Sequence, residues 1–158
     1  MDAPNPDFMR EAIRLGLNGM RAGMGGPFGC VIVREGAVLA RGFNQVLHLK
    51  DPTAHAEMVA IRIACRALDS FQLTGCDLYT SCEPCPMCLG AIYWSRPSRV
   101  FFANTRDDAA AIDFDDEFIY EELDRPISER SIPMIQLLRD EAQPAFQEWL
   151  TKLDRQNY

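Results

Sequence analysis

Residues 77–88 read DLYTSCEPCPMC, and this stretch decides the fold. Its first four residues predict a short strand. The residues from Cys85 onward predict a helix that ends near Arg96-Pro97, because proline cannot continue a helix there. An apolar strand over residues 99–103 follows. This alternation of strand, helix and strand is typical of an α/β fold, with parallel strands covered by helices.

The remaining segments extend the same α/β pattern. Apolar residues at helical spacing predict a helix over residues 7–22, followed by a hairpin over residues 30–40 and a helix over residues 52–68. The last third predicts a short helix over residues 115–123, an apolar strand over residues 132–138 and a helix over residues 144–153. With 158 residues, the chain has the length of one domain.

Two short motifs have the spacing of a zinc site. His55 is followed by Glu57, and Cys85 is followed by Cys88 in a Cys-x-x-Cys motif. One imidazole and two thiolates supply three of the four ligands that zinc prefers, which leaves the fourth position for water. We therefore expect one catalytic Zn²⁺ per subunit, held by His55, Cys85 and Cys88.

Glu57 is the expected proton carrier of this site. Three other residues already supply the ligands, so Glu57 is not needed as one. Zinc lowers the pKa of its bound water to about 7. No stronger base is then needed, and one carboxylate suffices as general acid and base. Residues two apart do not share a face on a regular helix. Residues 51–53, however, read DPT, a strong helix start. We expect His55 and Glu57 near that helix end, where both side chains can point beyond it.

Two other interpretations of the cysteines stay open from the residues alone. Cys82 could be a fourth ligand that closes a purely structural zinc site. Cys85 and Cys88 could instead be a thioredoxin-like redox pair, although such a pair needs no upstream histidine and glutamate. The other three cysteines are predicted to be small buried hydrophobic residues without a function: Cys30, Cys65 and Cys76.

The charge of the chain argues against a nucleic-acid partner. Its 23 acidic residues exceed its 16 basic ones, which gives a net charge of −7. A protein that binds tRNA or DNA needs clustered Lys and Arg, so a small neutral substrate fits better. The N-terminus lacks an export signal, and no stretch approaches a membrane-spanning length. We expect a cytoplasmic protein without nucleic-acid or membrane contact.

Three longer motifs together carry a resemblance to a known family. Residues 25–29 read GGPFG, residues 51–57 read DPTAHAE, and residues 81–94 read SCEPCPMCLGAIYW. The pattern H-x-E followed by P-C-x-x-C is the signature of zinc-dependent base deaminases. The chain resembles the cytidine deaminase-like superfamily and, within it, the small bacterial guanine deaminases. Residues 114–120 and Tyr158 separate it from the tRNA adenosine deaminases.

The resemblance implies a fold, an assembly and a set of residues that bind a purine base. The fold is a three-layer α/β/α sandwich around a five-stranded mixed sheet, with residues 1–158 as one zinc domain. The assembly is a homodimer whose C-terminal segments are exchanged between the subunits. Asn44 would hydrogen-bond the purine ring, Phe28 would stack on its face and Trp94 would pack near it. Asp116 would accept from its N–H edge, and Tyr158 would come from the partner chain.

Plainer interpretations of these residues stand beside the resemblance. Asn44 at a strand end is often a turn residue, Phe28 and Trp94 are ordinary core candidates, and Asp116 is typical of a helix start.

The predicted reaction is the zinc-dependent hydrolytic deamination of guanine to xanthine and ammonia, in purine catabolism or salvage. The alternatives are deamination of adenosine in tRNA and deamination of guanosine or cytosine, because the zinc apparatus does not select which amine leaves. A structural zinc module without turnover is the alternative from another class.

Overall fold

The computed structural model of the chain describes residues 3–157. It divides into two compact units, Met1–Asp116 and Glu117–Tyr158. The first unit contains the sheet, both hydrophobic clusters and the predicted metal ligands. Among the residues that the structure describes, all buried side chains belong to this first unit. The prediction of one domain over residues 1–158 stays a prediction.

The sheet of the first unit is mixed. Its strands are β1 (Gly29–Arg34), β2 (Ala37–Phe43), β3 (Cys76–Cys82) and β4 (Arg99–Asn104), in the order β2-β1-β3-β4. Strand β1 runs antiparallel to both β2 and β3, and β3 runs parallel to β4. Consequently β2, β3 and β4 all run in one direction, and their carboxyl ends lie at the same edge of the sheet.

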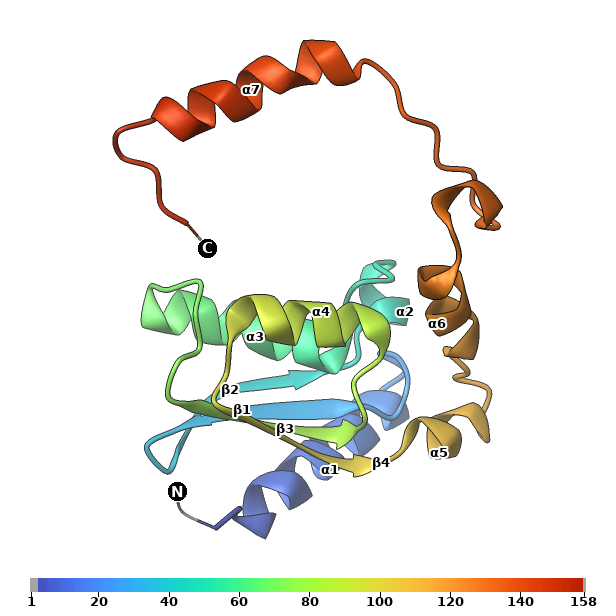
Figure 1. Cartoon of the computed structure of the whole chain (residues 1–158). Coiled ribbons are helices and arrows are strands. Elements are labelled where there is room, and N and C mark those ends of the chain that lie inside the picture. The colour runs from blue at the N-terminus through green and yellow to red at the C-terminus, as the bar shows by residue number, and fades with distance from the viewer. Residues whose placement is uncertain (1–2, 158) are drawn as a thin grey trace. The chain divides into compact units, whose positions relative to one another are not determined.

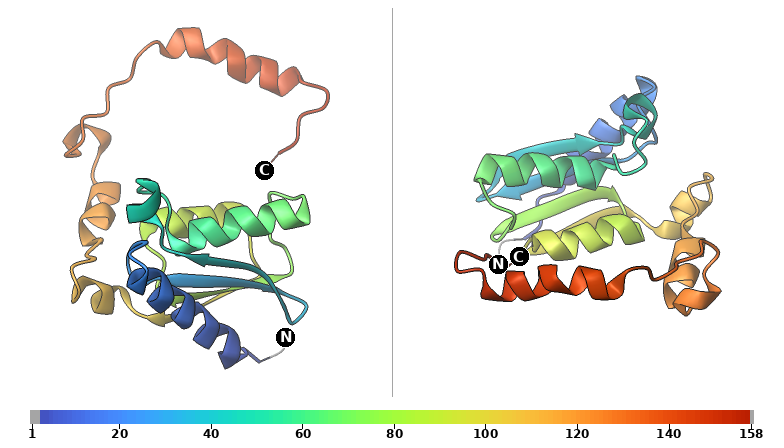
Figure 2. Two further views of the ribbon diagram at one scale, coloured as in Figure 1. Left: turned by 180° about the vertical axis from the view of Figure 1, so that it is seen from behind. Right: turned by 90° about the horizontal axis from the view of Figure 1, so that it is seen from above.

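Helices cover both faces of this sheet (Figure 1). Helix α1 (Pro6–Arg21) packs on one face, and α3 (Ala56–Leu68) and α4 (Pro86–Ser95) pack on the other. The view from behind in Figure 2 shows the same three layers. Two short helices that the sequence did not predict, α2 (Val46–Leu49) and α5 (Arg106–Ala110), lie in the connections after β2 and β4. The three-layer α/β/α prediction is confirmed.

Two clusters of buried side chains hold the layers together, one on each face of the sheet. The larger cluster joins β1 and β3 to α3 and α4, and it includes Ile32, Leu78, Ile61 and Ile92. The smaller cluster joins the other face to α1 through Val31 and Tyr79. The two central strands, β1 and β3, are buried on both faces, so their burial does not alternate along the strand.

The prediction of five strands is wrong, since the part of the chain that the structure describes forms four. The expected fifth strand, residues 132–138, has no regular structure and is largely exposed, with Ile135 at 86% and Leu137 at 79% of full exposure. Apolar residues alone do not make a strand, because its backbone must pair with a sheet edge, and Pro133 cannot donate to such a ladder.

The second unit is helical. It contains α6 (Glu117–Asp124), a 3₁₀ turn (Ile127–Glu129) and α7 (Arg139–Thr151). The short helix over residues 115–123 is thereby confirmed to within two residues, whereas the last helix begins five residues before the predicted start. None of the described residues after Asp116 is buried. Among residues 3–157, no helix combines the length and the apolar character needed to cross a bilayer.

Candidate metal centre and active site

The site lies at the sheet edge where β2 and β3 end. After β2 the chain passes through α2 and enters α3, and after β3 it enters α4 (Figure 1). Helix α3 packs closely on β2, since a Cβ atom added at Gly42 would lie 2.2 Å from the carbonyl oxygen of Ala56. A glycine at this point therefore lets the first turn of α3 approach the sheet.

Helix α3 begins later than the sequence predicted. We expected its start at Pro52 with Asp51 or Thr53 as the cap, but His55 is the N-cap residue and Ala56 is the first helical residue. The Asp51 carboxylate instead accepts hydrogen bonds from the backbone N–H and the hydroxyl of Thr53, both at 2.8 Å. Because this local turn uses the capping carboxylate, the helix begins only after His55, whose own backbone is extended.

The same arrangement recurs at α4. Cys85 is its N-cap residue, Pro86 occupies the first turn, and Cys88 follows one turn later. Neither His55 nor Cys85 makes a side-chain capping hydrogen bond to its own helix. The side chains at both helix ends are thus directed away from their helices, toward each other.

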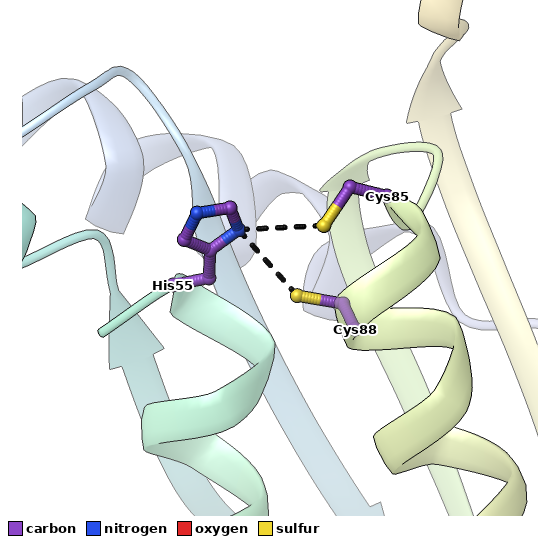
Figure 3. A group of neighbouring side chains, drawn as sticks. All are labelled: His55, Cys85 and Cys88. Atoms are coloured by element: carbon purple, nitrogen blue, oxygen red, sulfur yellow. Dashed lines mark hydrogen bonds between the residues drawn. The ribbon is translucent and has the colours of Figure 1, made fainter. Parts of the chain in front are cut away.

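Figure 3 shows these three side chains converging from the two helix ends. His55 Nδ1 lies 3.5 Å from Cys85 Sγ and 3.6 Å from Cys88 Sγ, and the possible ligand atoms all lie within 4.8 Å of one another. With Zn–S near 2.3 Å and Zn–N near 2.1 Å, tetrahedral coordination places nitrogen and sulfur about 3.6 Å apart. The donor set therefore fits zinc in both type and spacing.

The pKa values of the Cys85 and Cys88 thiols depend on each other. Hydrogen bonding from Cys88, together with the adjacent imidazole of His55, lowers the pKa of Cys85 to about 4. The hydrogen bond to Cys85 and then burial raise the pKa of Cys88, and the nearby charges of Glu57 and Cys85 add to this rise. The hydrogen bond to Cys85 also raises the pKa of His55. Such a pair carries one negative charge by itself, and a divalent cation would favour two.

Cys82 is not part of this group. Its thiol is buried and lies 3.5 Å from the carbonyl oxygen of Thr105, and burial raises its pKa to about 11. The metal-binding group that residues 3–157 form contains three donors, and Cys82 is not one of them. The closed four-ligand site that the sequence left open therefore lacks its fourth ligand in this geometry.

Glu57 lies in the first turn of α3 and is only 6% exposed. Its Oε1 accepts a hydrogen bond from the Thr80 hydroxyl at 2.9 Å, and its Oε2 lies 3.5 Å from Cys88 Sγ. Burial raises the pKa of this carboxyl, which the hydrogen bond from Thr80 opposes. The carboxyl group is thus held directly beside one of the metal donors.

Asn44 follows β2 and is 5% exposed. Its side-chain oxygen accepts from the backbone N–H groups of Gly26 and Val46, at 3.3 and 3.2 Å. A Cβ atom added at Gly25 would lie 2.1 Å from that oxygen. The turn interpretation of Asn44 therefore holds for its oxygen, and the amide nitrogen is the group that remains for a ligand.

Phe28 and Asp116 also belong to the first unit. Phe28 packs against the larger core cluster, and the edge of its ring meets Phe114 at 5.0 Å between ring centroids. Asp116 is partly buried, and burial and then the charge of Cys85 raise its pKa. The charge of Cys85, one of the candidate metal donors, therefore acts on the carboxyl group of Asp116.

Two predicted site residues remain, Trp94 and Tyr158. Trp94 lies nine residues after Cys85 and six after Cys88 on α4, and it is 63% exposed. At 1.5 Å per residue, these separations are about 13.5 Å and about 9 Å along the helix axis. The role of Trp94 beside the base stays a prediction. Tyr158 lies outside the described residues.

Sequence reasoning missed Thr80. It is 1% exposed in the middle of β3, where a threonine is an ordinary strand residue. Its partner Glu57 is 23 positions earlier on another element, so no spacing rule connects the two.

Comparison with known proteins agrees with this geometry. The family model "Cytidine and deoxycytidylate deaminase zinc-binding region" matches residues 4–104. Guanine deaminase of Bacillus subtilis is 53% identical over 151 residues, which cover 96% of this chain and 97% of that protein. The X-ray structure of guanine deaminase from Bacillus subtilis superposes with a TM-score of 0.94 and covers 99% of both chains.

More distant relatives share less of the chain. A structure described as guanine deaminase from Nitrosomonas europaea has a TM-score of 0.69 at 31% identity and covers 94% of this chain and 85% of its own. The tRNA-specific adenosine deaminase of Aquifex aeolicus is 51% identical, but over 77 residues that cover 49% of this chain and 51% of that protein.

Proposed function

This chain belongs to the cytidine and deoxycytidylate deaminase zinc-binding family, and we propose that it hydrolyses guanine to xanthine and ammonia with one zinc ion per subunit. The observation that carries the proposal is the convergence of His55, Cys85 and Cys88 beside the buried carboxyl group of Glu57. The likeness to guanine deaminase over nearly the whole chain selects the substrate.

The three donors hold the metal, and Glu57 moves the protons. Zinc bound at this position would supply the Lewis acidity that makes water a nucleophile near neutral pH. Glu57 takes a proton from the water that attacks C2 of guanine and passes one to a ring nitrogen. It then takes the proton of the new C2 hydroxyl group and delivers it to the exocyclic amine as the C2–N bond breaks, so that ammonia leaves and the C2 carbonyl of xanthine remains. A carboxyl group held beside the metal donors is suited to each of these transfers.

Two polar groups distinguish guanine from other bases. Guanine offers a carbonyl acceptor and ring N–H donors, so it needs one donor and one acceptor from the protein. Asn44, whose oxygen is already engaged by backbone N–H groups, supplies the donor through its amide nitrogen. Asp116, near Cys85, supplies the acceptor. Phe28 stacks on the face of the base. Polar groups left unpaired by a wrong base can discriminate by roughly 10⁴.

The tRNA-specific alternative is less well supported. The match to the Aquifex aeolicus enzyme covers about half of each protein, whereas the match to guanine deaminase covers nearly the whole chain. Acidic residues outnumber basic ones by 23 to 16, which opposes binding to a phosphate backbone.

The assembly is a homodimer in which each C-terminal segment crosses to the partner and Tyr158 completes the partner's site. The support is that the second unit buries none of its described residues, while Leu137 is 79% and Leu153 104% exposed. Such a segment gains stability only by covering another apolar surface. Trp94, on the same helix as Cys88, would pack near the base. The cytoplasmic location stays a prediction.

The test measures ammonia release by the purified protein from guanine, guanosine, adenine and cytosine. We expect release from guanine at a rate at least tenfold above the other three. A tRNA stem-loop added at moderate salt tests the alternative. Release from adenosine in the stem-loop but not from guanine would overturn the proposal.

A further inference from the structure

Thr80 makes a buried hydrogen bond to Glu57 that has no role in the proposed reaction. Its hydroxyl donates to Oε1 of Glu57 at 2.9 Å, and the two residues are 1% and 6% exposed. A hydroxyl that donates to a carboxylate makes one of the stronger hydrogen bonds in proteins. The donor lies on β3, the same strand that leads into α4 and its cysteines.

The other carboxylate oxygen is in a different situation. Oε2 lies 3.5 Å from Cys88 Sγ, one of the three candidate metal donors. The two oxygens therefore have different neighbours: Oε1 is bound by Thr80 on β3, and Oε2 lies beside the metal group.

We infer that Thr80 is a positioning residue that ties Oε1 of Glu57, so that Oε2 carries the proton transfers of the reaction proposed above. The terminal torsion of a glutamate is broad, and a free carboxylate can turn either oxygen toward the site. The Thr80 hydroxyl removes that freedom. It comes from a strand that is buried over nearly its whole length, which is a rigid support for such a contact.

A purely structural role for Thr80 makes a different prediction. In that case the hydrogen bond only satisfies a buried hydroxyl, and its loss would lower the thermal stability without a specific effect on turnover. Positioning predicts that kcat falls while KM and the zinc content stay the same, because Thr80 is 1% exposed and is not one of the candidate metal donors.

The experiment compares Thr80→Val and Thr80→Ser with the wild type in kcat, KM, zinc per chain and Tm. Val keeps the shape and removes the donor, so we expect kcat to fall by about 10- to 100-fold, as for other residues that orient a functional group. KM and zinc content should stay within about twofold. Ser restores the hydroxyl and should recover most of kcat. If the Val variant does not fold, Thr80→Ala removes the same donor without adding a methyl group and replaces it.

Cys76→Ala is the matched control. Cys76 is fully buried at the other end of β3, so its truncation also lowers Tm but leaves Glu57 untouched. We expect its kcat to stay within about twofold of the wild type.

A Thr80→Val enzyme with full kcat, or one that loses zinc together with turnover, would overturn the inference. A wild type that deaminates another base instead of guanine would sink the proposed substrate only, and the Thr80 comparison would then be made on that base. A wild type that releases ammonia from no base overturns both.

Discussion

The two units of this chain differ in what holds them together. Residues up to Asp116 bury side chains on both faces of a four-stranded sheet, and the helix ends at one edge of that sheet present the metal donors. The residues described after Asp116 form helices of comparable length but bury no side chain. Helices therefore do not distinguish the two units. The sheet of the first unit, on which its helices pack, distinguishes them.

The contrast between the packed first unit and the exposed second unit indicates which of them can hold a metal site. A metal site needs its ligands held within a few tenths of an ångström, and only packed elements provide that precision. In the first unit, His55 and Cys85 occupy N-cap positions of helices that pack on the sheet. The second unit offers exposed apolar side chains, which suit a surface that docks. Three substitutions and one deletion test this contrast between the two units.

The largest effect is expected from removing a ligand in the first unit. Cys88→Ala should lose the zinc and, with it, activity by about 10³-fold or more, because the metal supplies several kcal/mol of transition-state stabilisation. Zinc per chain and ammonia release measure the two effects. Cys30→Ala, which truncates a buried cysteine outside the metal group, should keep its zinc. Full zinc in Cys88→Ala would reassign the ligand set to Cys82.

Removing the proton carrier should separate catalysis from metal binding in the same unit. Glu57→Gln replaces a buried carboxyl by a neutral amide of the same shape, so zinc content and Tm should not fall. The value of kcat should fall by about 10²- to 10⁴-fold. Steady-state rates and zinc analysis provide the measurement. A variant with wild-type turnover would refute the role of Glu57.

The packing that places α3 can be tested at Gly42. A Cβ atom there would lie 2.2 Å from the carbonyl oxygen of Ala56, so Gly42→Ala must push the first turn of α3 off the sheet. We expect a loss of about 1–3 kcal/mol in the free energy of unfolding, together with weaker zinc binding.

Gly90→Ala is the matched control for that change. Gly90 lies inside α4 with no atom within 4 Å of an added Cβ. Alanine there should stabilise the protein by about 0.5–1 kcal/mol, since glycine is a poor helix residue. Chemical denaturation measures both variants, and equal stabilities would contradict the close packing of α3.

The smallest effect is expected in the second unit. Deleting Tyr158 should slow guanine turnover by roughly tenfold, or about 1.4 kcal/mol, and leave Tm and zinc content unchanged. Thermal unfolding and steady-state kinetics are measured on the same preparation. An unaffected turnover would mean that the C-terminus does not close a site.

The sequence was informative where local rules apply. The hairpin of β1 and β2, the strand before the cysteine helix and the end of that helix at Ser95 were all predicted, because turn residues and proline act locally. The start of α3 was predicted too early, since the Asp51 carboxylate serves a turn and not the helix. The apolar run over residues 132–138 wrongly predicted a strand, because periodicity does not reveal whether a sheet edge is available.

The sequence alone identified the candidate metal donors and predicted Glu57 as the proton carrier, because the types and spacings of His55, Cys85 and Cys88 limit what chemistry is possible. Only the tertiary structure decided that Thr80 meets Glu57, that the oxygen of Asn44 is already engaged, and that Cys82 stands apart from the other thiols. These contacts join residues from separate elements of the fold, and their distances depend on how helices pack on the sheet. Packing is a property of the whole fold, which no local pattern records.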